Sequence, residues 1–265
     1  MTLAPDPVIL DVSPAGVAEI LLNRPQAGNA IDVLLIQGLA DALETLRGAD
    51  HVRVVIVRGA GDVFCVGSGP EWLGRQGERD GAQNEADFLA FGRALKALHD
   101  LPQMTIAMIK GAAYGGGVGL AAACDVCIAM RSTGFRFAEP RVGLAATMVA
   151  PFVVEAIGPR WAKALMVSTE TFDGGFAEKI GLVQFAVDTE KDFDAMGEHI
   201  AKLAFTTAPG AVAEVKSALR EVVHEKLDDH LIKSMAKRLA HLRESDEGRE
   251  GVAALLEGRK PSWEG

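Results

Sequence analysis

The sequence predicts a mixed α/β protein with parallel strands, followed by a helical C-terminal region. A strand-like run, a glycine-rich turn and a helical run follow one another twice, over residues 52–72 and 105–124. Strands that alternate with helices in this way pair in parallel, so we expect ββα units. After residue 190 every segment follows the helical repeat of apolar residues. We therefore expect an α/β core over residues 1–190 and a helical region over 191–265.

Two strands are expected ahead of this alternation, at residues 8–12 and 17–22. A helix should follow, capped by Asn29 or Asp32. Its apolar residues lie at helical spacing, at Leu34, Leu35, Leu39, Leu43 and Leu46. The polar, glycine-rich segment 72–88 is interpreted as a mobile loop or a frayed helix, in a place suited to a substrate lid.

The second half of the chain should be mostly helical. Gly181 is expected to end a helix in the left-handed conformation. A short strand should follow at 182–187. The expected helices span 149–157, 160–167, 172–180, 192–205, 210–224, 227–242 and 246–256. The last of them places Val252, Leu255 and Leu256 on one stripe, which suits docking on the core or on another subunit.

Composition excludes several classes of protein. The net charge of -9 argues against nucleic acid as the main ligand. No apolar run is long enough to span a bilayer, and the first ten residues do not resemble a signal peptide. Three cysteines fit a reducing compartment, so we expect a cytoplasmic protein. Cys124 and Cys127 form a C-x-x-C pair, which we interpret as buried structural thiols rather than a redox or zinc site.

The most informative stretch runs from residue 104 to residue 144. A strand-like run leads through Gly115, Gly116 and Gly117 into a helical run, which leaves backbone N–H groups free at the start of the helix. Glycine lets a ligand oxygen approach those groups closely. Glu139 follows among apolar neighbours. An anion hole beside a general acid/base is one interpretation; a phosphate cradle or close helix packing are the others, although the spacing of nucleotide-binding motifs is absent.

Six segments in order resemble the crotonase superfamily, the enoyl-CoA hydratases and isomerases. They are LNRPQAGNAID, VIVRGAGDVFCVGSGPEWL, AAYGGGVGLAAACDVCIA, FAEPRVGL, FDGGFAEKIGLVQFAV and REGVAALLEGRKPSW. The variants GGGVGL and GLAATMVAPFVVEAIG look most like the methylglutaconyl-CoA hydratase branch. The resemblance implies a crotonase-type spiral of ββα repeats with a C-terminal helical trimerisation region. It also implies homotrimers, or hexamers built as dimers of trimers.

The resemblance also implies a site. Its substrate is an acyl-CoA thioester; coenzyme A is part of that substrate, and no separate cofactor or metal is expected. By matching position, the backbone N–H groups of Ser68 and Gly116 are the oxyanion donors and Glu139 is the catalytic carboxylate. The positions that match coenzyme A contacts are Gln26, Ala27, Gly28 and Val66.

Three departures from the family pattern bear on the reaction. Gly119 stands where most hydratases of this family have a second glutamate, Gly69-Pro70 replaces the usual Asp-Leu, and Pro140 follows Glu139 instead of preceding it. Hydration of a 2-enoyl-CoA through a stabilised enolate is the leading hypothesis. The alternatives are a 3,2-enoyl-CoA isomerase that uses a single glutamate, and an acyl-CoA-binding homologue without catalytic activity.

Overall fold

A six-stranded sheet forms the centre of the structure, a computed structural model that describes residues 6–264. The strand order is β1-β2-β3-β4-β6-β8. The first two strands, β1 (Val8–Val12) and β2 (Val17–Leu22), are antiparallel, and every later pair in this sheet is parallel. The others are β3 (Val54–Gly59), β4 (Met104–Ile109), β6 (Val126–Met130) and β8 (Phe185–Val187). The expected parallel α/β core is therefore confirmed.

A second, two-stranded sheet lies next to the glycine-rich stretch. It pairs β5 (Ala112–Tyr114) with β7 (Gly134–Arg136) in parallel. The chain passes from β5 through Gly115 directly into the short helix α4 (Gly116–Ala122). Soon after β7 comes a 3-10 turn, η2 (Glu139–Val142), which carries Glu139. Two neighbouring strands thus deliver the glycine turn and the candidate carboxylate to the same end of this small sheet.

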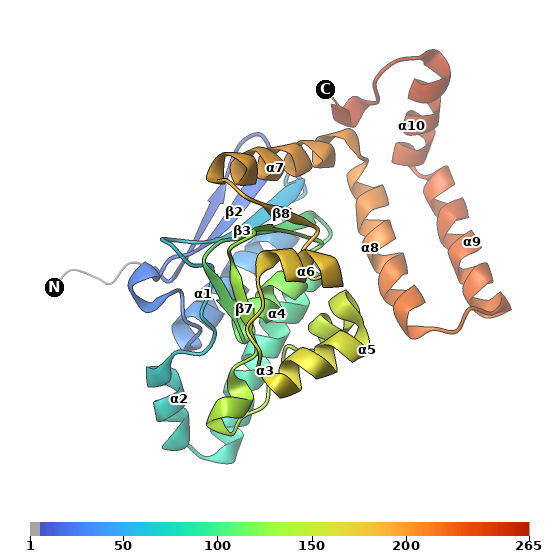
Figure 1. Ribbon diagram of the computed structural model, residues 1–265. Coiled ribbons are helices and arrows are strands. Elements are labelled where there is room, and N and C mark those ends of the chain that lie inside the picture. Colours follow the sequence, from blue (N-terminus) through green and yellow to red (C-terminus); the bar gives the residue numbers. More distant parts are fainter. Residues whose placement is uncertain (1–5, 265) are drawn as a thin grey trace.

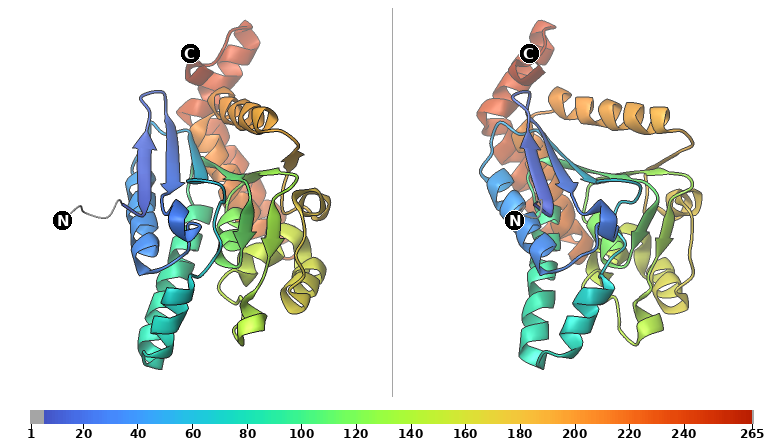
Figure 2. Two further views of the ribbon diagram at one scale, coloured as in Figure 1. Left: turned by 60° about the vertical axis from the view of Figure 1, so that its left-hand side comes forward. Right: turned by 90° about the vertical axis from the view of Figure 1, so that its left-hand side faces the viewer.

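Helices pack against both faces of the large sheet (Figure 2). The main apolar core joins the sheet to α1 (Val33–Arg47) and α3 (Gly81–His99). Within α1 the expected leucines are buried except Leu34, which is 66% exposed. Asp32 caps α1 by accepting a hydrogen bond from Leu35 N at 3.0 Å, which settles the choice between the two capping candidates.

The opposite face of the sheet has its own apolar cluster. Phe193 and Ile200 of α7 (Glu190–Leu203) pack there with Val54 and Ile106. Because α7 lies in the part of the chain assigned to the helical region, this region begins in contact with the sheet. The division of the chain at residue 190 stays a prediction.

Two helices cover most of the segment 72–88, which we interpreted as a mobile loop or frayed helix. These are α2 (Pro70–Gly77) and the start of α3. Asp80 caps α3 by accepting from Gln83 N at 2.8 Å, and the Gln83 side chain accepts from Asp80 N at 3.3 Å. This capping box satisfies the free N–H groups that a glycine-rich helix start would otherwise expose. The loop expectation was wrong because it weighed glycine content above capping.

Two glycines interrupt or end the helices α5 and α6, which precede the C-terminal region. α5 (Ala150–Ser168) contains a break at Gly158, where φ is 71°, so the two helices expected there are present with one break between them. α6 (Gly174–Ile180) ends at Gly181, whose φ of 91° confirms the expected left-handed cap.

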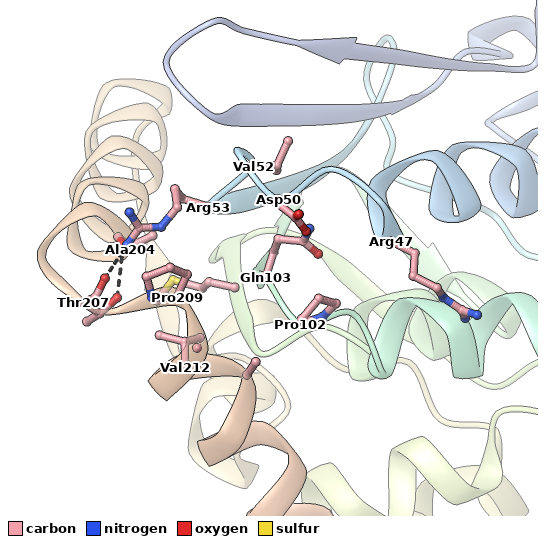
Figure 3. Close-up of a pocket in the computed structure, with 13 residues that line it drawn as sticks. Arg47, Asp50, Val52, Arg53, Pro102, Gln103, Ala204, Thr207, Pro209 and Val212 are labelled. Carbon is pink, nitrogen blue, oxygen red and sulfur yellow. Dashed lines mark hydrogen bonds between the residues drawn. The ribbon is translucent and has the colours of Figure 1, made fainter. Parts of the chain in front are cut away.

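The C-terminal helices form an arm that extends from the α/β body (Figure 1). They are α8 (Pro209–His224), α9 (Asp229–Glu244) and α10 (Asp246–Glu257). Lys216 of α8 fixes the arm, since its Nζ donates to Asp125 Oδ2 at 2.7 Å and to Gln103 O at 2.9 Å. Arg53 holds the link before α8 by donating to the backbone carbonyls of Ala204 and Thr207, beside a cavity of about 270 Å³ (Figure 3).

The three cysteines are free thiols in this structure. Cys65 and Cys127 are buried and Cys124 is half-buried. Burial raises the pKa of Cys65 and of Cys127 to about 12, so neither forms a thiolate near neutral pH.

Within residues 6–264 no helix is long and apolar enough to cross a membrane, and no cluster of side chains is suited to hold a metal ion.

Candidate active site

A cavity of about 390 Å³ lies between α2, α3, α4 and the segment that contains η2. Most of its lining is apolar: Trp72, Leu73, Phe88, Phe91, Leu144, Met148 and Val149. Four residues named from the sequence also line it, namely Val66, Ser68, Gly116 and Glu139. The structure therefore brings the two expected oxyanion donors and the expected carboxylate into one apolar cavity.

Backbone hydrogen bonds join the two loops that carry Ser68 and Gly116. Tyr114 N donates to Cys65 O at 2.9 Å, and Cys65 N donates to Ala112 O at 3.1 Å. Gly67 has φ of 78°, and a Cβ there would lie 2.6 Å from Tyr114 O. No side chain fits in that gap, so position 67 needs glycine for both its conformation and its close approach. The two donors are thereby held at a fixed separation.

The backbone N–H groups of Ser68 and Gly116 have no hydrogen-bond acceptor among the described residues. Three nearby N–H groups are paired: Gly67 N contacts Cys65 Sγ at 3.4 Å, Gly69 N donates to Ile31 O at 3.4 Å, and Gly115 N donates to Arg136 O at 2.8 Å. Gly116 is the first residue of α4, where helix geometry leaves the N–H free. Both groups are thus available to an oxygen atom in the cavity.

Glu139 lies half-buried at the wall of the same cavity. Its Oε1 comes so close to Gly115 that a Cβ on that glycine would lie 2.2 Å away. Its Oε2 is buried and has no hydrogen-bond partner among the described residues. Burial raises the pKa of this carboxyl, and the nearby backbone N–H groups of Glu139 and Ala138 oppose that shift less strongly. A raised pKa brings a carboxyl closer to the pH range in which it can both accept and return a proton.

The expected coenzyme A loop adjoins the first donor loop. Val66 N donates to Gly28 O at 3.0 Å, and a Cβ on Gly28 would lie 2.9 Å from Val66 Cγ1. Gln26 and Ala27 lie exposed on the 3-10 turn η1 (Pro25–Ala27). The four positions therefore form one surface next to Ser68.

Asn29 fixes this loop, a role that the sequence reasoning missed. It is fully buried, with φ of 54°. Its Oδ1 accepts from Arg24 N at 2.8 Å, and its Nδ2 donates to Ala60 O and Val63 O, both at 2.9 Å. Asparagine tolerates the left-handed conformation better than most residues do, which was the available signal.

Comparison with known proteins gives the family. The family model described as enoyl-CoA hydratase/isomerase matches residues 13–265. The chain belongs to the enoyl-CoA hydratase/isomerase family, within the crotonase superfamily. The bovine (Bos taurus) protein "Enoyl-CoA hydratase domain-containing protein 2, mitochondrial" is 31% identical over 262 residues, covering 94% of this chain and 85% of that protein.

Solved structures of other proteins share the fold. Pseudomonas aeruginosa AtuE matches with a TM-score of 0.93 at 31% identity, covering 98% of this chain and 100% of that chain. An enoyl-CoA hydratase from Shewanella pealeana matches with a TM-score of 0.92 at 29% identity, covering 97% and 96%. The crotonase-type fold expected from the sequence is therefore confirmed, and the family implies an acyl-CoA substrate.

Gly119, where the family resemblance places a second glutamate, has no room for a side chain. A Cβ there would lie 2.2 Å from Val149 Cγ1 and 3.5 Å from Leu95 Cδ1. Val149 itself is 2% exposed and lines the cavity. The space that a second carboxylate would take in this crotonase is thus filled by an apolar side chain. Val149 was not recognised from the sequence, because only the fold brings it to Gly119.

The departure from the crotonase pattern at Gly69-Pro70 is accommodated locally. Ile31 N donates to Gly67 O at 2.8 Å, and Leu73 N donates to Gly69 O at 3.0 Å. Pro70 is the first residue of α2, as expected from its fixed φ. These bonds hold the loop that carries Ser68 without the missing aspartate.

Proposed function

We propose that the chain hydrates a 2-enoyl-CoA thioester and that Glu139 is the proton carrier. The observation that carries this proposal is the shared cavity: two backbone N–H groups without acceptors and one carboxyl with a raised pKa line the same apolar space. In the described part of the chain, Glu139 is the only carboxylate among the lining residues.

The proposed reaction places the thioester oxygen on Ser68 N and Gly116 N. Glu139 takes a proton from water while the water oxygen bonds to Cβ, and the electron pair of the double bond moves toward the thioester oxygen. The two donors stabilise the resulting enolate; losing one such donor costs about 2.7–4 kcal/mol in other enzymes. Glu139 then returns its proton to Cα, which completes the addition of water.

Isomerisation is the second candidate, and one observation favours it. Val149 covers Gly119, so the cavity offers no second carboxylate to hold a water molecule. In this reaction Glu139 removes a proton from C2 of a 3-enoyl-CoA and returns it at C4, while the same two N–H groups stabilise the dienolate. The names of the bovine and Shewanella relatives both contain the words enoyl-CoA hydratase, which supports hydration as the first candidate.

We further propose how the substrate and the subunits are held. Coenzyme A would lie along Gln26, Ala27, Gly28 and Val66, which form one surface beside Ser68. The arm would bind other copies of the chain in a trimer or a hexamer. Support comes from Leu255 and Leu256, which are 78% and 81% exposed, and such side chains gain stability when another surface covers them.

The test uses two substrates and one variant. Crotonyl-CoA should lose its conjugated-thioester absorbance if the enzyme is a hydratase, and a 3-hexenoyl-CoA should gain that absorbance if it is an isomerase. Glu139→Gln should lower turnover of the active substrate by at least about 100-fold, since general acid–base catalysis contributes about 10²–10⁴-fold. Tight binding of both thioesters without turnover would instead indicate an acyl-CoA-binding homologue, and turnover by Glu139→Gln would remove Glu139 from its role.

A further inference from the structure

Thr169 has a backbone conformation that is rare for its residue type. It is one of two non-glycine residues with positive φ in the described chain, with φ of 56° and ψ of 23°. It ends α5 and is only 6% exposed. A β-branched residue in the left-handed region is strained, and glycine is the usual residue at such a helix end. Something other than helix termination therefore accounts for a threonine here.

Two arginines converge on Thr169. Arg141 Nε donates to Thr169 Oγ1 at 2.7 Å, and Arg141 Nη2 contacts Thr169 O at 3.4 Å. Arg136 Nε donates to the same carbonyl at 3.1 Å. Neither guanidinium has a carboxylate within ion-pair distance in the part of the chain that the structure describes. Thr169 is thus the shared acceptor of both side chains.

These arginines lie on either side of Glu139 in the sequence. Arg136 ends β7, and its carbonyl accepts the hydrogen bond from Gly115 N at 2.8 Å. Arg141 lies on η2, the same turn as Glu139, and its own N–H donates to Ala138 O at 3.0 Å. The short segment that carries Glu139 is therefore attached to Thr169 at both of its ends.

We propose that the hydrogen bond between Arg141 and Thr169 positions Glu139 against Gly115 in the active-site cavity. Arg141 is a positioning residue: it lies on η2 with Glu139 and acts through the backbone of that turn. Tyr114 is the only other titratable side chain among the described residues that line the cavity. The inference rests on the proposed role of Glu139.

A purely structural role predicts different behaviour. A cation at the C-terminal end of α5 would stabilise that helix whatever happens at the cavity. Removing such a contact would lower the melting temperature and leave kcat unchanged. Loss of positioning would instead lower kcat with little change in KM, because binding groups elsewhere still hold the substrate.

Five single variants separate these roles. Arg141→Met and Thr169→Val remove the donor and the Oγ1 acceptor while keeping similar shapes. Thr169→Ser keeps the acceptor, and Arg141→Lys restores a donor of different geometry. Arg160→Met is the matched control, because Arg160 is an exposed arginine on α5, the helix that Thr169 ends. We expect the first two to lower kcat about 10- to 100-fold, the range that a displacement near 1 Å can cause. Thr169→Ser and Arg160→Met should keep kcat, and Arg141→Lys should recover part of it.

A titration of the carboxyl gives a readout that needs no substrate. In protein labelled with ¹³C at glutamate Cδ, the signal absent from Glu139→Gln identifies Glu139. Its pKa should fall toward the ordinary glutamate value in Arg141→Met and Thr169→Val, because a displaced carboxyl is better solvated, and should stay unchanged in Arg160→Met. The double variant that combines Arg141→Met with Glu139→Gln should turn over substrate no more slowly than Glu139→Gln alone.

The proposal is overturned if both Arg141→Met and Thr169→Val keep kcat and the Glu139 pKa, even with a lower melting temperature. It is also overturned if Arg141→Met lowers turnover further in the Glu139→Gln background, since it would then act elsewhere. Failure of the proposed function is separate: Glu139→Gln alone would retain turnover, while the titration would still report the position of the carboxyl.

Discussion

The carboxylate of Glu139 occupies the space that a side chain at position 115 would fill. A Cβ on Gly115 would lie 2.2 Å from Glu139 Oε1 and 3.0 Å from Glu139 Cδ. Gly115 also has φ of 47° and immediately precedes the N–H of Gly116. One glycine therefore makes the turn that frees the oxyanion donor and leaves the room in which the carboxyl lies. The acid/base group and the anion hole are coupled through this contact.

Gly115→Ala should consequently impair catalysis more than stability. The Gly115 backbone, with φ of 47° and ψ of -110°, lies in a region that costs an L-residue about 1–3 kcal/mol, and the methyl group must also displace the Glu139 carboxyl. We expect kcat to fall by at least about 100-fold, as for other displacements of a catalytic group. Gly258→Ala is the control, because Gly258 has φ of 66° with nothing within 4 Å of its Cβ position. Equal kcat values in steady-state assays of the two variants would contradict this coupling.

Gly119→Ala should destabilise the protein through a single contact, that with Val149. Overpacking a filled core costs about 1–3 kcal/mol, and the added methyl group would lie 2.2 Å from Val149 Cγ1. Val149→Ala removes that obstacle, so the double variant should be more stable than the sum of the single effects by about 1 kcal/mol or more. Urea unfolding of the four proteins measures this. Additive effects would show that Val149 does not fill the position.

Most of the sheet could be predicted from the sequence because its signals are local. β4 and β6 are short apolar runs, and β1 and β2 flank a clear turn. The start of α3 was missed because its capping box is a pair of side-chain contacts that outweigh glycine content. Local propensity therefore failed where specific capping bonds decide the structure.

The site followed from the sequence only in part. The glycine turn and the apolar setting of Glu139 are local features, and the structure places both at one cavity. Val149 against Gly119 and Thr169 under Arg141 are contacts between residues about 30 positions apart, made by packing of α5 on the rest of the fold. No spacing or composition in the sequence encodes such contacts.

The pH dependence of stability should reveal the buried carboxyl. Burial raises the pKa of Glu139 above its ordinary value of 4.5, so the folded state binds this proton more tightly than the unfolded state. Stability from this group is therefore fully present below the ordinary pKa and is lost as pH rises through the folded-state pKa. Glu139→Gln should melt at a higher temperature than the parent at neutral pH, and the difference should shrink toward about pH 4.

Thermal melting across this pH range checks the expectation. The control is Glu85→Gln, because Glu85 is exposed on α3, away from the cavity lining. Its melting temperature should follow that of the parent protein at every pH. A Glu139→Gln difference that is constant from acid to neutral pH would mean that the carboxyl is not destabilised by burial.

The exposed leucines of α10 give the test of assembly. Leu255 and Leu256 are 78% and 81% exposed in a single chain, and Leu239 of α9 is 69% exposed. Burying one such side chain contributes about 1.5–3 kcal/mol, repeated at each symmetric contact. Light scattering should give three or six times the 28.0 kDa chain mass, and Leu255→Ser with Leu256→Ser should shift the protein toward the monomer. Leu34→Ser, at a leucine of α1 that is 66% exposed, should leave the mass unchanged. A parent protein that is monomeric at micromolar concentration would exclude the proposed trimer and hexamer.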